Sequence, residues 1–146
     1  MSAVMNRSAE AGHRDHDDLA KLLLRVTLGV LILLHGIAKV SGGPDFVMGA
    51  VGKAGLPAQF AYLVYVGEVI APLLLIAGVI TRAAALVVAI NMAFAVLLVH
   101  VPQLFTLSNT GGWALELQGM YFVAALTVAL LGAGRYALSS PAARWN

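Results

Sequence analysis

The chain has 146 residues, of which 60% are apolar and 11% charged, and it contains no cysteine. This composition is typical of a single small membrane domain and excludes an ordinary soluble globule. Without cysteine, the chain can form no disulfide, thiolate metal site or thiol redox relay, so any electron transfer needs a bound group or a partner. The net charge of +2 is small, and no basic cluster alternates with aromatic residues, which argues against binding to nucleic acid.

The first 18 residues are polar and mixed in charge, and we expect them to form a cytoplasmic tail. They lack the basic start and small-residue cleavage site of a secretory signal. Asp17 or Asp18 is expected to cap the start of the first helix. The stretch "HRDHDD" contains residue types that bind metals, but a solvated tail explains them, and we predict no metal site.

Four apolar segments follow, each long enough to cross a bilayer as a helix that rises about 1.5 Å per residue. They cover residues 19–40, 60–80, 83–101 and 113–132. They predict an all-α integral membrane four-helix bundle of up-down-up-down topology within residues 19–135, followed by a short cytoplasmic tail at residues 136–146. Only Thr81 and Arg82 separate the second and third segments, which indicates a tight antiparallel hairpin.

Lysine and arginine are distributed unevenly between the two ends of this bundle. Seven lie on the side of the termini, whereas only Lys39 and Lys53 lie on the other side. Because positive residues concentrate on the cytoplasmic side, both termini are expected in the cytoplasm. Arg25, Arg82 and Arg135 fall near cytoplasmic helix ends, where long side chains that reach the lipid headgroups are a sufficient explanation.

The remaining ionisable residues of the bundle all fall in its outer half: His35, Lys39, Glu68, His100 and Glu116. His35 and Lys39 are four residues apart and therefore share one helix face. Pro72 has no N–H to bond to the carbonyl of Glu68, so Glu68 needs partners for its backbone oxygen as well as for its carboxylate. These residues either form a binding site or are buried pairs, such as Lys39 with Glu68 or His35 with Glu116, that only fix the helix register.

Three pieces of the sequence resemble the DoxX family of small four-helix bacterial membrane proteins. They are "HGIAK" at 35–39, "GEVIAPLLLIAGVITRAAA" at 67–85, and the histidine that ends the third segment. DoxX-like proteins are similar to the membrane subunit of thiosulfate:quinone oxidoreductase. The resemblance therefore implies a multi-pass protein of the bacterial inner membrane that acts with quinone.

The leading hypothesis is a membrane subunit or small redox protein that binds quinone in the outer half of the bundle. His35, Lys39 and Glu68 supply hydrogen-bond donors and proton-handling groups, with Glu68 and His35 as the catalytic pair and His100 and Glu116 as further contacts. Electrons would come from a partner redox protein or through a homo-oligomer. The alternatives are a proton-coupled transporter or carrier, a non-catalytic membrane anchor, and haem held by His35 and His100.

Overall fold

The structure, a computed structural model, describes residues 2–140 and 143–146, with side chains from Arg14 onward. The described residues are all-helical apart from loops and one isolated bridge between Leu107 and Trp113, so the prediction of an all-α chain is confirmed there. In chain order the elements are α1 (Ser2–Gly42), α2 (Asp45–Lys53), η1 (Ala58–Ala61), α3 (Tyr62–Tyr65), η2 (Val66–Ile70), α4 (Ala71–Ala77), α5 (Thr81–Ala95), η3 (Val96–His100), η4 (Val101–Gln103) and α6 (Glu116–Leu131).

Three helical stretches are long and apolar enough to cross a membrane: Arg14–Gly42, Ala58–Ala77 and Thr81–Gln103. They match the first three predicted segments. The fourth apolar helix, α6, has 16 residues, which gives a length of about 24 Å at 1.5 Å per residue, against the ~30 Å of a bilayer core. Residues 113–115 precede this helix and lie in a loop and turn. The described chain therefore has three membrane-capable helices and one shorter apolar helix.

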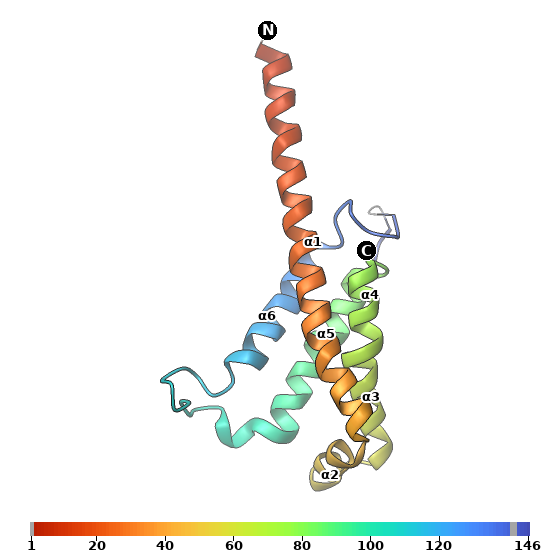
Figure 1. Ribbon diagram of the computed structural model, residues 1–146, viewed down its shortest axis with the longest axis vertical. Coiled ribbons are helices and arrows are strands. Elements are labelled where there is room, and N and C mark those ends of the chain that lie inside the picture. The colour runs from red at the N-terminus through yellow and green to blue at the C-terminus, as the bar shows by residue number, and fades with distance from the viewer. Residues whose placement is uncertain (1, 141–142) are drawn as a thin grey trace.

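Helix α1 starts at Ser2, well before the predicted start at residue 19. Asp17 and Asp18 consequently lie inside the helix, and the prediction that one of them caps its start is wrong. No proline interrupts residues 2–18, so the helix that nucleates in the apolar part of α1 can continue toward the N-terminus. Figure 1 shows these first turns projecting beyond the other helices.

The bundle has two distinct ends, which we name by their elements. The turn end carries the α4–α5 turn and the C-terminal segment, and α1 projects beyond it toward the N-terminus (Figure 1). The α2 end, opposite, carries α2 (Figure 1). Between them, α1 packs on α4, α4 on α5, and α5 on α6, around a buried core that includes Leu28, Ile32, Leu75, Val88 and Val128.

The segment after α6 folds back over the α4–α5 turn. Leu138 and Ser139 donate backbone hydrogen bonds to the carbonyls of Ala77 and Gly78, at 3.1 and 3.3 Å. The side chain of Asn146 is buried and accepts hydrogen bonds from the backbone N–H and the hydroxyl of Thr81. Asn146 thereby satisfies a free N–H at the start of α5, as an N-cap residue would.

The prediction that Arg25 extends to the lipid headgroups is wrong. Its side chain is buried, with only 1% of its surface exposed. The guanidinium donates to the carbonyls of Leu75 and, at 2.9 Å, Ile76, which lie in the last turn of α4. It also donates to the carbonyl of Tyr136 at 2.6 Å. The last carbonyls of a helix have no partner within the helix and carry partial negative charge, so a buried cation is stabilised there.

Arg82 plays the same role for α6. Its guanidinium donates to the carbonyls of Ala129 and Leu130, both at 2.9 Å. Arg135, in contrast, is exposed and forms a 2.5 Å ion pair with Asp15 of α1. Two of the three arginines that the sequence assigned to the headgroups therefore bind helix C-termini.

Candidate functional site

The packing of α1 on η2 determines where Glu68 lies. The helix widens to π geometry over Val66–Ile70, beside Pro72, whose missing N–H breaks the regular hydrogen-bond pattern. Gly36 of α1 is buried against this widened turn, and a Cβ atom at position 36 would lie 2.1 Å from the carbonyl oxygen of Glu68. The backbone of α1 therefore rests directly on the carbonyl that Pro72 frees, and no larger residue fits at position 36.

Replacing Gly36 with alanine is expected to lower the free energy of unfolding by roughly 1–3 kcal/mol, because the new methyl group forces α1 away from η2. Gly49, inside α2, is the matched control, since a Cβ atom there meets no atom within 4 Å. We expect Gly49→Ala to be neutral or stabilising by about 0.5–1 kcal/mol through helix propensity. Thermal unfolding in detergent measures both variants, and equal stability of the two would contradict the close α1–η2 contact.

The carboxylate of Glu68 is held by two other helices. Its side chain is only 3% exposed, and its Oε1 atom accepts hydrogen bonds from Lys39 Nζ at 2.5 Å and from Asn91 Nδ2 at 3.2 Å. Lys39 remains 32% exposed, so this ion pair lies between the protein interior and the surface. Among the described residues, the second carboxylate oxygen of Glu68 is buried and has no hydrogen-bond partner.

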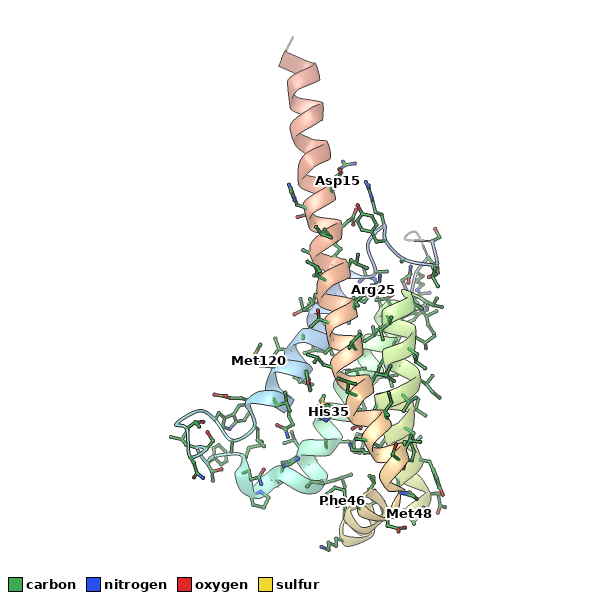
Figure 2. The ribbon with its side chains drawn as sticks, in the orientation of Figure 1. Asp15, Arg25, His35, Phe46, Met48 and Met120 are labelled. Atoms are coloured by element: carbon green, nitrogen blue, oxygen red, sulfur yellow. The ribbon has the colours of Figure 1, made fainter. Side chains whose placement is uncertain are left out.

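A cavity of about 240 Å³ opens beside this cluster, toward the α2 end. Residues of α1, α2, η2, α5, η3 and α6 form its walls. Figure 2 shows His35 and Phe46 toward the α2 end and Arg25 toward the turn end. The polar wall residues are His35, Lys39, Glu68, His100, Gln118 and Tyr121. Four of the five predicted site residues therefore line one cavity.

Aromatic, imidazole and amide side chains line this cavity beside the Lys39–Glu68 pair. The rings of His35 and Tyr121 meet edge to face, with centroids 5.9 Å apart. His100 Nδ1 lies 2.8 Å from Gln103 Oε1, and its Nε2 lies 3.4 Å from Gln118 Nε2. Gln118 Oε1 is buried and, within the described part of the chain, has no partner. Two buried acceptors, on Glu68 and Gln118, are thus without donors.

Glu116 does not join this group. It is exposed at the first residue of α6, and its Oε1 atom accepts a hydrogen bond from the backbone N–H of Trp113 at 3.1 Å. This contact satisfies a free donor in the turn before α6. Of the two ion pairs that the sequence suggested, Lys39 with Glu68 is present, whereas Glu116 bonds within its own turn.

Sequence analysis missed three residues of the site: Asn91, Gln118 and Tyr121. Each carries an uncharged polar group in an otherwise apolar helix, whereas all of the predicted site residues are charged residues or histidines. A buried amide inside a membrane helix needs a partner just as a carboxylate does, so Asn91 within "LVVAINMAF" was the available signal.

The apolar helices and the polar cavity between them define a helical membrane protein with a polar site in its bundle. The chain belongs to the DoxX family, whose model matches residues 20–101. This match covers Gly36, Lys39, Glu68 and Asn91, whereas α6 lies outside it.

Two curated relatives are similar along most of their length. A Haemophilus influenzae protein named "Uncharacterized protein" is 32% identical over 121 residues, covering 80% of this chain and 86% of the relative. A Bacillus subtilis protein named "Putative oxidoreductase CatD" is 31% identical over 101 residues, 69% of each chain. No solved structure matches.

Proposed function

We propose that the protein is a redox protein or membrane subunit that binds one quinone or quinol ring in the 240 Å³ cavity. The observation that carries this proposal is the buried Glu68 oxygen without a partner, beside a cavity whose other walls offer donors. An engineered cavity of ~150 Å³ binds benzene, so this cavity is large enough for a substituted six-membered ring. The name of the Bacillus subtilis relative is in line with a redox role.

The residues in the cavity match both oxidation states of such a ring. Quinone carbonyls accept hydrogen bonds, and Lys39, His35 and the Tyr121 hydroxyl can donate them. Quinol hydroxyls donate, and the free oxygens of Glu68 and Gln118 can accept. A bound quinone supplies the two-electron, two-proton chemistry that the side chains lack. Glu68 and His35 hold and pass the protons, and electrons arrive from a partner redox protein or a second copy of the chain.

We further propose that the protein lies in the bacterial inner membrane, with both termini in the cytoplasm and the α2 end outside. The seven-to-two distribution of lysine and arginine supports this orientation. Both termini lie toward the turn end of the bundle, opposite α2, which is compatible with it (Figure 1).

Single-cysteine labelling tests this orientation, and the absence of native cysteine makes the background clean. Lys53 and Arg144 are both exposed, at opposite ends of the bundle. In intact cells, an impermeant maleimide is expected to label Lys53→Cys and to leave Arg144→Cys unlabelled until the membrane is opened. The reverse pattern would refute the orientation and an outward-facing cavity together.

The content of the purified protein tests the proposed ligand. An organic extract is expected to contain quinone in an amount that approaches one per chain, and Glu68→Gln is expected to reduce that amount. Asp45→Asn is the matched control, because Asp45 is an exposed carboxylate at the start of α2 that does not line the cavity. A haem absorbance band, or an extract in which quinone does not exceed that of the bulk membrane, would contradict the proposal.

A further inference from the structure

A second, smaller cavity lies on the other side of the Lys39–Glu68 pair from the polar cavity. This intermediate cavity, of about 50 Å³, shares Lys39, Phe46 and Glu68 with the polar cavity as wall residues. On its other side, the intermediate cavity shares Val64, Asn91, Phe94 and Leu98 with a third cavity of about 220 Å³. The three cavities therefore follow one another from the α1–α6 side of the bundle to the α3 side.

The third cavity, which we call the apolar cleft, differs sharply in chemistry from the first. Its walls come from α2 and the loop after it, from η1, α3 and η2, and from α5 and η3. Asn91 is its one wall residue with a polar side chain; the others include Phe60, Leu63, Val66, Val87 and Ile90. Most of these side chains are partly exposed on the lateral surface of the bundle, where the surroundings in a membrane are hydrocarbon.

One glycine, Gly67, leaves room for the apolar cleft to extend to Asn91, on the side of the Lys39–Glu68–Asn91 cluster that faces away from the polar cavity. Gly67 lines the cleft, and a Cβ atom there would lie 2.5 Å from the side chain of Asn91. No side chain from η2 therefore stands between the cleft and Asn91, whose amide donates to Glu68. The polar cluster separates a polar cavity on one side from an apolar cleft on the other.

We infer that the ligand is an amphiphile with a single-ring head in the polar cavity and one hydrocarbon chain that passes the intermediate cavity into the apolar cleft. This inference rests on the proposed function and adds the class of quinone. The intermediate cavity, at about 50 Å³, has roughly a third of the ~150 Å³ of an engineered cavity that binds benzene, so it is too small for a ring and leaves room for a hydrocarbon chain.

A phospholipid fits this arrangement less well. Its phosphate would meet the carboxylate of Glu68, because the ammonium of Lys39 is already paired with that carboxylate. The phosphate itself also offers no hydrogen-bond donor to the free oxygens on Glu68 and Gln118. A ligand with hydroxyls on its head group and one hydrocarbon chain suits both the polar cavity and the apolar cleft.

A large side chain placed in the apolar cleft tests the binding of the ligand's hydrocarbon chain separately from the binding of its ring. Ile90→Trp places a large side chain in the cleft from an exposed position on α5, and Leu86→Trp, one turn earlier and in none of the three cavities, is the matched control. The probes are a ring-only benzoquinol and the same benzoquinol with a ten-carbon chain, titrated calorimetrically against purified protein. Val66→Trp fills the cleft from the facing helix if Ile90→Trp does not fold.

The wild type is expected to bind the chain-bearing probe at least about tenfold more tightly, since burial of two methylene groups already gives that factor. Ile90→Trp is expected to remove most of this preference without weakening the ring-only probe, and Leu86→Trp to keep it. Equal affinity of both probes for the wild type, or equal loss in both tryptophan variants, would overturn the inference while the proposed function stands. Failure of both probes to bind the wild type would overturn the proposed function itself.

Discussion

Lys39→Met is expected to lower the free energy of unfolding by about 3 kcal/mol, within the ~3–5 kcal/mol that follows loss of one partner of a buried ion pair. The reason is the position of Glu68, which is 3% exposed and would keep only Asn91 as a hydrogen-bond partner. The expected loss lies at the low end because Lys39 is partly exposed.

The double variant Lys39→Met with Glu68→Gln distinguishes an unpaired charge from lost packing. A neutral amide at position 68 removes the buried charge, so we expect the double variant to recover most of the lost stability. Lys53→Met, at an exposed position, is the control and is expected to melt within a few degrees of the wild type. If Lys39→Met melts like Lys53→Met, the pair does not hold α1 against η2.

Arg25→Met is expected to destabilise the turn end by about 3 kcal/mol or more, because three backbone carbonyls lose charged donors at once. Two of them belong to the end of α4 and the third, of Tyr136, to the segment that folds back over it. Arg25→Lys should retain part of this stability, since one ammonium cannot reproduce the planar fork of a guanidinium.

The rate of trypsin cleavage in the C-terminal segment is a second measurement of the effect of Arg25→Met. When its bond to Tyr136 is lost, the chain around Arg135 is expected to open more often and trypsin to cut there faster. Arg14→Met, at an exposed position of α1, is the control and should change neither melting nor cleavage. Unchanged melting and cleavage in Arg25→Met would restore the interpretation that Arg25 only reaches the headgroups.

The sequence predicted those parts of the site that depend on local spacing. His35 and Lys39 are four residues apart on one helix, so a shared face follows from helix geometry alone. Pro72 predicted the disturbed backbone at Glu68, and the π-helical turn Val66–Ile70 lies there. Both predictions needed only the identity of residues within about one turn.

The features that the sequence could not predict depend on where distant segments meet. The contacts of Arg25 lie 50, 51 and 111 residues away. The first two exist because α1 packs on α4, and the third because the chain after α6 returns over the α4–α5 turn. Glu116 was placed in the outer half of a span that starts at residue 113, but α6 starts at Glu116 itself, so its carboxylate binds the preceding turn. Neither fact follows from periodicity.

The central claim is that Glu68 handles protons for a bound quinone, and does not merely hold the helices together. The ion pair of Glu68 with Lys39 is compatible with proton handling and with a purely structural role. The two hypotheses predict different effects of Glu68→Gln on turnover. The amide keeps an oxygen that can accept from Lys39, whose ammonium is partly exposed and can stay hydrated, so the protein is expected to remain folded. An amide does not titrate near neutral pH, so proton transfer at this position is lost.

The most direct test is quinone-dependent turnover of Glu68→Gln in membranes that contain the copurifying partner, measured beside thermal stability and the amount of folded protein. We expect a protein that melts within a few degrees of the wild type and has lost its turnover by a factor of about 100 or more, the usual contribution of a positioned acid or base. Asp45→Asn serves as the control and should keep full turnover. Full turnover in a stable Glu68→Gln protein, or a loss that only follows the loss of folded protein, would contradict the claim.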